Sequence, residues 1–154
     1  MWPYGRATAL TALFTLASCL PGLAQPRHEV SLNGTWQVVK VKDLTAPPPA
    51  DGWRPIEVPG YLDGYNYERA WFKRTFEVPA AMAGARIALY FGGVKYNSTL
   101  YVNGQKVGGT LNGFVPFECD ITDAARVGQE NEVLVGLHDW TGVFKDNTLS
   151  LIHI

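Results

Sequence analysis

The sequence is poor in the residues that most often carry chemistry. Among its 154 residues there are only two cysteines and three histidines, and the formal net charge is −1. Their spacing indicates neither a metal site nor a Ser/His/Asp triad, so no metal and no cofactor is expected. Basic residues are scattered along the chain, which excludes an extended cationic surface. Nucleic acid is therefore not expected as a partner.

Cysteine is too scarce to stabilise the domain by cross-linking. Cys19 lies in an apolar leader, which leaves Cys119 as the one cysteine of the region expected to fold. An intradomain disulfide is thus excluded, and stability must come from a hydrophobic core. Cys119 alternates with Phe117 and Ile121 in a strand-like run. This pattern predicts a buried thiol that has no chemical role.

Residues 1–24 are typical of a secretory signal peptide. Arg6 is their only charge, and the apolar run at 7–20 is shorter than the roughly 20 residues that a membrane-spanning helix needs. Two processing routes remain open: cleavage after Ala24, or a lipoprotein signal in which Cys19 is acylated. We therefore expect an exported protein, periplasmic or extracellular, without a transmembrane segment and with a lipid anchor only in the second case.

From residue 31 onward, apolar and polar residues alternate, and no long stretch has helical spacing. Asn103-Gly104 is typical of a type I′ turn and predicts a tight hairpin. Gly92-Gly93 and Gly108-Gly109 follow strands without opening a helix and are interpreted as turn glycines. Strands are expected at 35–41, 71–78, 86–91, 99–102, 105–107, 114–121 and 132–137.

These features predict an all-β domain at 27–147. Seven or eight short strands over about 120 residues, separated by turn residues, are typical of a two-layer sandwich or jelly roll. A proline-rich segment at 45–52 is expected to be a loop. Residues 148–154 break off in mid-pattern and look like translated sequencing adapter. We expect this tail not to be native and the reading frame to be truncated.

The acidic residues do not indicate a catalytic pair. Glycoside hydrolysis needs two carboxyl groups about 5 to 10 Å apart. The acidic residues instead lie singly in expected turns or on outward strand faces, and surface charge is the default for each of Asp51, Glu57, Asp63, Glu68, Glu77, Glu118, Asp120 and Asp123. Tryptophan rings do stack on sugars, but in a β-sandwich they belong more often to the core. Composition alone therefore does not establish carbohydrate binding.

Several motifs resemble the N-terminal domain of family 2 glycoside hydrolases, the group of β-galactosidases, β-glucuronidases and β-mannosidases. Residues 70–79, AWFKRTFEVP, resemble the family stretch W-Y-R-R-x-F-x-V-P. Further matches follow in family order: FGGV at 91–94, YVNGQ at 101–105, GFVPF at 113–117, DIT at 120–122 and NEVLV at 131–135. The opening SLNGTW at 31–36 also fits, so the resemblance covers nearly the whole expected domain.

The resemblance implies a galactose-binding-like jelly roll that packs beside an immunoglobulin-like domain and a (β/α)₈ barrel. The barrel carries the two catalytic glutamates and needs about 250 residues. This chain has no room for it, so no catalytic residue is assigned. The resemblance implies a non-catalytic, sugar-binding accessory domain of an exported O-glycosidase, with a carbohydrate substrate and the other two domains as partners. A stand-alone carbohydrate-binding module and a purely structural interaction sandwich are the alternatives.

One loop is a candidate for substrate contact. In some family members, a loop after the last strands of this domain reaches the active site of the barrel with a polar side chain. His138-Asp139-Trp140 occupies that place in this sequence. The resemblance therefore makes Asp139 and Trp140 the substrate-binding candidates, and an ordinary polar loop is the alternative.

Overall fold

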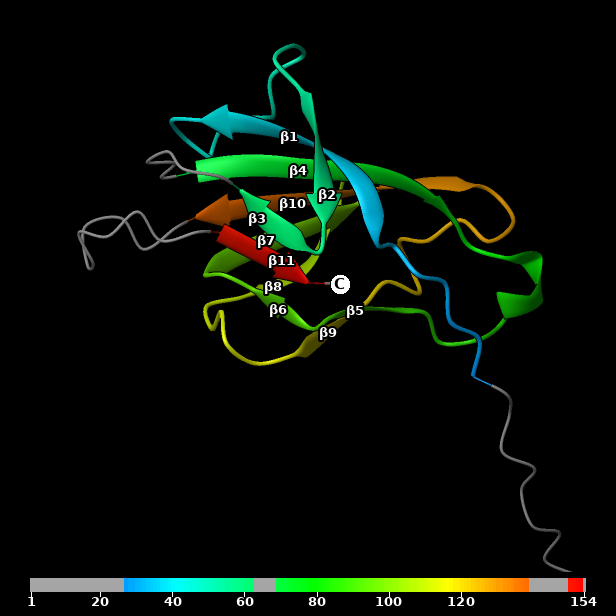
Figure 1. The fold of residues 1–154 in the computed structure, drawn as a ribbon. Helices are drawn as coiled ribbons and strands as arrows, with labels where there is room; N and C mark the ends of the chain where they lie inside the picture. Colours follow the sequence, from blue (N-terminus) through cyan, green and yellow to red (C-terminus); the bar gives the residue numbers. More distant parts are fainter. Residues whose placement is uncertain (1–26, 63–68, 139–149, 154) are drawn as a thin grey trace, which may run out of the picture.

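The computed structural model describes residues 27–62, 69–138 and 150–153. Within these ranges the chain forms eleven strands, one 3₁₀ turn and no α-helix (Figure 1), which confirms the all-β prediction but exceeds the expected number of strands. The elements are β1 (Gly34–Val41), β2 (Arg54–Val58), β3 (Gly60–Leu62), β4 (Arg69–Glu77), η1 (Ala80–Met82), β5 (Ala88–Phe91), β6 (Gly93–Val94), β7 (Asn97–Val102), β8 (Gln105–Thr110), β9 (Phe117–Asp120), β10 (Glu130–His138) and β11 (Ser150–His153).

The strands form one large sheet and two small ones. The large sheet is antiparallel and has six strands in the order β2-β1-β4-β10-β7-β8. Opposite it lie the pair β5-β9 and the three-stranded sheet β3-β11-β6 (Figure 1). None of the described segments forms a helix that is long and apolar enough to cross a membrane.

The core lies between these layers and follows from strand register. Val38, Phe72, Val135 and Leu100 are register partners across β1, β4, β10 and β7, and each is at most 1% exposed. Directly paired residues of antiparallel strands point to the same face, so this row faces the small sheets. Burying such a side chain stabilises the fold by about 1.5–3 kcal/mol. The alternation of apolar and polar residues in the sequence therefore predicts correctly which side chains of these strands form the core.

The predicted hairpin is confirmed. Asn103 and Gly104 connect β7 to β8 with φ angles of 51° and 82°, the left-handed values that a type I′ turn requires. Asn103 also contacts a residue beyond the turn, because its side-chain amide donates to the Ala124 carbonyl at 2.8 Å. The turn thus fixes both the hairpin and the segment before β10.

Two predictions about the loop regions are wrong in detail. Gly108 and Gly109 lie inside β8, beside a register shift, and are not turn glycines. A Cβ on Gly108 would lie 2.5 Å from the Cys119 sulfur, so glycine allows β8 to approach β9 closely. The strand expected at 114–121 begins only at Phe117. Pro116 before it has no backbone N–H to donate to a ladder.

Candidate functional site

The two substrate-contact candidates, Asp139 and Trp140, lie outside the described residues. The structure does describe where their loop begins. β10 ends at His138, whose register partners are Arg69 of β4 and Asn97 of β7. The loop therefore leaves from the middle of the large sheet, and its role in substrate contact stays a prediction.

An exposed apolar loop lies at the same end of the domain. It joins β8 to β9 and begins after Thr110, the last residue of β8. Thr110 is paired with Ser98 of β7, which is the neighbour of Asn97. The loop exposes Leu111, Phe114 and Val115, with exposed fractions of 78%, 69% and 46%. Figure 1 shows it on the side where β10 ends. Large exposed apolar side chains that gather in one loop are typical of a contact surface.

Short-range contacts hold this loop in shape. The Phe114 amide donates to the Asn112 side-chain oxygen at 3.1 Å. The Phe114 ring meets the Tyr96 ring edge-on at a centroid distance of 5.4 Å, and the Lys95 ammonium lies 5.1 Å from the Phe114 centroid. A Cβ on Gly113 would lie 2.9 Å from the Lys95 Cα, so only glycine fits there. The apolar surface is therefore presented in a defined conformation.

Trp71 is buried on the outer face of the large sheet. Its neighbour Phe72 points into the core, and the two rings therefore lie on opposite faces. Trp71 is nevertheless only 3% exposed and packs over Gly136, where a Cβ would lie 2.7 Å from the ring. Its indole N–H has no hydrogen-bond partner in the described part of the chain. An unpaired buried donor costs about 1–3 kcal/mol, so an acceptor on this face would stabilise the domain.

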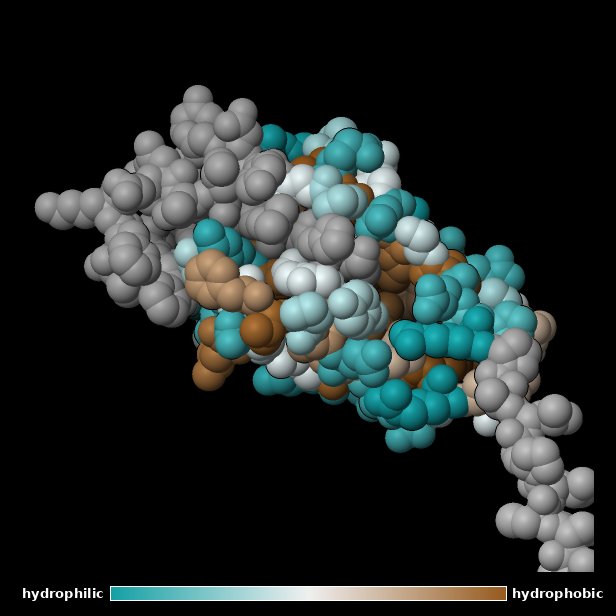
Figure 2. Space-filling model, turned by 60° about the horizontal axis from the view of Figure 1, so that its bottom comes forward, coloured by the Kyte–Doolittle hydropathy of each residue, from teal (hydrophilic) through white to brown (hydrophobic). Residues whose placement is uncertain are grey.

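A groove runs along the free side of β5. It has a volume of about 1310 Å³ and lies between the N-terminal segment at 27–32 and residues 76–90. Val30, Phe76 and Ile87 contribute apolar surface, while Arg86 and Glu118 contribute polar surface. In Figure 2, brown apolar surface is visible in a hollow that hydrophilic side chains border.

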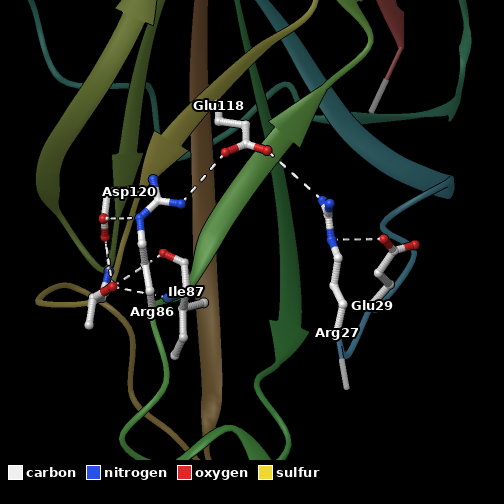
Figure 3. A network of polar contacts seen from close by, with 7 residues as sticks. Arg27, Glu29, Arg86, Ile87, Glu118 and Asp120 are labelled. Atoms are coloured by element: carbon white, nitrogen blue, oxygen red, sulfur yellow. Dashed lines mark hydrogen bonds and ion pairs between the residues drawn. The ribbon is translucent and has the colours of Figure 1, made fainter. Parts of the chain in front are cut away.

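A chain of opposite charges borders this groove (Figure 3). The Arg86 Nε lies 2.8 Å from an oxygen of Asp120, and its Nη1 lies 3.7 Å from Glu118. Glu118 also faces Arg27 at 3.9 Å, and Arg27 pairs with Glu29 at 3.0 Å. Glu118 and Asp120, which were expected to be isolated surface charges, are thus parts of one exposed network. Exposed ion pairs stabilise a fold by only about 0–1 kcal/mol each.

The carboxyl groups with displaced pKa values are not suited to general acid catalysis. The pKa of Asp120 is lowered, first by hydrogen bonds from Thr122 and then by Arg86. That of Asp43 is lowered by hydrogen bonds from Thr45. A glycosidase acid needs a raised pKa, so both shifts have the opposite direction. Among the described residues, no group of three or more His, Cys, Asp and Glu is placed to hold a metal ion.

Cys119 behaves as its pattern predicts. The residue is 6% exposed and belongs to the hydrophobic core. Burial raises the pKa of its thiol, which keeps the thiol protonated and unreactive at neutral pH. The prediction of a buried structural cysteine is confirmed.

These layers of antiparallel strands form a β-sandwich. The family profile described as "Glycosyl hydrolase 2 galactose-binding domain-like" matches residues 53–143, more than half of the chain. The chain belongs to this family, the galactose-binding-like domains of family 2 glycoside hydrolases.

Known proteins of the family support this assignment. A β-glucuronidase from Paenibacillus borealis is 40% identical over 65 residues, which cover 42% of this chain and 11% of that protein. A β-galactosidase from Bacteroides ovatus is 26% identical over 132 residues, which cover 73% of this chain and 16% of that protein. The crystallised β-glucuronidase of Ruminococcus gnavus with D-glucuronic acid matches the fold with a TM-score of 0.66 at 23% identity, covering 76% of this chain and 23% of that one. The chain thus spans 11% to 16% of the length of the two curated relatives.

Proposed function

We propose that this chain is the non-catalytic accessory domain of an exported family 2 glycosidase of the β-glucuronidase or β-galactosidase type. The relatives with these names are far longer than the region they share with this chain. In this proposal the catalytic carboxyl groups belong to another domain of the parent enzyme.

The observation that carries the proposal is the exposed apolar loop beside the end of β10. Phe114 and Leu111 are 69% and 78% exposed, and register places their loop next to the strand that leads to Asp139. Apolar surface of this kind is stabilised when another domain covers it. The same end of the sandwich thus combines a docking surface with the proposed substrate loop.

Asp139 and Trp140 would then form one wall of a substrate pocket in the parent enzyme. A polar side chain and an aromatic ring are the groups that orient and stack on a sugar. The remaining walls would come from the catalytic domain. A pocket divided in this way loses most of its convergent contacts when the domain stands alone.

Hydrolysis assays on the 154-residue chain and on the parent enzyme test the proposal. The chain alone is expected not to cleave aryl β-glucuronides, β-galactosides or β-mannosides, whereas the parent enzyme cleaves at least one of them. Turnover by the chain that disappears on substitution of one of its acidic residues would contradict a non-catalytic role.

Export is tested separately from catalysis. The chain is expressed in a bacterium with its own leader, and the mature N-terminus is identified by mass spectrometry. Cleavage after Ala24 or acylation at Cys19 supports export by one route or the other. A cytoplasmic product that retains residues 1–24 would contradict it.

A further inference from the structure

We propose that Asn33-Gly34, at the start of β1, is a site of spontaneous covalent modification, at which Asn33 becomes aspartate or isoaspartate with the assistance of Arg74. This inference does not depend on the proposed function. Asparagine is among the chemically labile residues of proteins. Glycine after it leaves the following backbone nitrogen open to reaction, because glycine has no Cβ. The chain contains three such pairs, Asn33-Gly34, Asn103-Gly104 and Asn112-Gly113.

The reaction needs a mobile asparagine side chain and a backbone nitrogen that can lose its proton. The Gly34 nitrogen gives its proton to the solvent and attacks the side-chain carbonyl carbon of Asn33. A C–N bond forms between them, and the side-chain nitrogen takes up a proton and leaves as ammonia. Water then adds to one of the two carbonyl carbons of the resulting succinimide ring. The ring opens to aspartate or to isoaspartate, and only water is consumed.

Arg74 is placed to favour loss of the Gly34 proton. Its Nη1 donates to the carbonyl oxygens of Asn33 and Leu32, at 3.0 Å each. A Cβ at Gly34 would lie 3.3 Å from the same nitrogen. When the Gly34 nitrogen is deprotonated, peptide-bond resonance spreads the negative charge onto the Asn33 oxygen. A guanidinium that already donates to this oxygen stabilises the charge, as the donors of an oxyanion hole do.

The Asn33 side chain is not held away from that nitrogen. Asn33 is exposed, and none of the hydrogen bonds among residues 27–62, 69–138 and 150–153 involves its side-chain amide. Its backbone is held, because its N–H donates to the Ser31 hydroxyl at 3.3 Å and its carbonyl accepts from Arg74. A rotating side chain on a fixed backbone repeatedly brings the two reacting groups together within one chain.

Asn103-Gly104 is protected by the hydrogen bonds of its asparagine. The Asn103 amide nitrogen donates to the Ala124 carbonyl and to the Asn131 side-chain oxygen, at 2.8 Å each. Its side-chain oxygen accepts from the Glu132 amide at 3.0 Å. Attack by the Gly104 nitrogen would require all three bonds to break, and each contributes about 0.5–1.5 kcal/mol. The pair that forms the hairpin turn should therefore react slowly.

Asn112-Gly113 is restrained less strongly. The Asn112 side-chain oxygen accepts from the Phe114 amide at 3.1 Å. A Cβ at Gly113 would lie 2.9 Å from the Lys95 Cα, so the backbone at this glycine is tightly packed. Because ring formation turns the backbone at the glycine, this packing opposes the reaction. We expect Asn112 to react more slowly than Asn33 and faster than Asn103.

The modification alters the attachment of the N-terminal segment to the sandwich. Either product places a new carboxylate beside Arg74. Isoaspartate also lengthens the main chain by one carbon between Leu32 and β1. Leu32 is 5% exposed, and its carbonyl accepts from the Trp36 indole at 2.8 Å, so it is the residue by which the segment is inserted into the core.

Peptide mapping of the aged chain tests the site. The purified 154-residue chain is kept for several weeks at mildly alkaline pH, once folded and once in guanidinium chloride. Trypsin then places the three pairs on separate peptides, 28–40, 96–106 and 107–126, which mass spectrometry compares. In the folded chain Asn33 should convert at least about tenfold faster than Asn103, and in the denatured chain the three rates should lie within about threefold of one another. If Asn33 is not the fastest site in the folded chain, or if the same ratios persist in denaturant, the proposal is wrong.

Substitution of the arginine tests its part in the reaction. Arg74→Gln should slow conversion of Asn33 in the folded chain about three- to tenfold and should have no effect in denaturant. Arg86→Gln is the matched control, because Arg86 bonds to Asp120 and not to Asn33, and the Asn33 rate should not change. Circular dichroism confirms the fold of both variants. A folded Arg74→Gln chain that converts Asn33 as fast as the unchanged chain, or faster, would overturn the assistance by Arg74.

Discussion

Asn103 and Asn131 are joined by a side-chain hydrogen bond of 2.8 Å that ties the β7–β8 turn to the start of β10. Asn131 is 1% exposed, and its carbonyl oxygen also accepts from the Arg126 backbone amide at 2.7 Å. Its amide nitrogen donates to the carbonyls of Arg126 and Gln129. A single buried side chain thus satisfies backbone groups of the segment that precedes β10.

Replacing Asn131 by alanine should therefore destabilise the domain strongly. The change removes the side-chain partner of the Arg126 amide and of the Arg126 and Gln129 carbonyls, and each unsatisfied buried group costs about 1–3 kcal/mol. We expect the free energy of unfolding in urea to fall by about 2 kcal/mol or more. Asn112→Ala, in the exposed loop, is the control and should have a much smaller effect. If both substitutions lowered the free energy of unfolding equally, the buried hydrogen-bond network of Asn131 would not be the source of the destabilisation.

Gly104→Val should lower the melting temperature through backbone strain alone. A Cβ at Gly104 would meet no atom within 4 Å, so no steric clash contributes. The residue has φ of 82°, where a β-branched side chain costs about 1 kcal/mol or more. Gly104→Asn is the comparison, because asparagine tolerates positive φ and should retain most of the stability. If Gly104→Val melted at the same temperature as the unchanged chain, backbone strain at this position would be excluded.

The lowered pKa of Asp120 predicts a stability difference that depends on pH. A carboxyl group whose folded pKa is depressed stabilises the fold above its unfolded pKa of about 3.9, and this stabilisation is lost as pH falls through the folded pKa. Asp120→Asn should therefore lower the melting temperature at pH 7. The difference from the unchanged chain should shrink as the pH falls below the unfolded pKa of about 3.9 and through the lower folded pKa. A difference that stays constant from neutral to acidic pH would exclude the hydrogen-bonded carboxylate as its source.

In the full-length parent enzyme, Asp139→Ala should lower kcat/KM without changing the melting temperature. This is the result expected of a side chain that contacts the substrate and not the core. Asp51→Ala, an exposed loop residue, should leave both quantities unchanged. If Asp139→Ala instead lowered the melting temperature and preserved activity, Asp139 would be a structural loop residue.

Local patterns were sufficient to predict much of the fold. Alternation marked β1, β4, β7 and β10, and Asn103-Gly104 marked the hairpin, because a two-residue period and a positive-φ turn depend only on neighbours in the chain. The glycines of β8 were misread, because their contacts with Cys119 and Ser98 come from other strands. A glycine in a turn and a glycine in a close strand contact look the same in a sequence.

What the sequence by itself determined is the all-β class, the family and the strand faces, since each follows from residue types at short spacing. Only the tertiary structure decided that Trp71 is buried on the outer face of the large sheet. It also brought Tyr90, Glu118 and Arg27 to one groove. Tyr90 and Glu118 belong to strands that are far apart in the chain, and Arg27 lies in the N-terminal segment. Their meeting depends on long-range strand pairing, which no local pattern encodes.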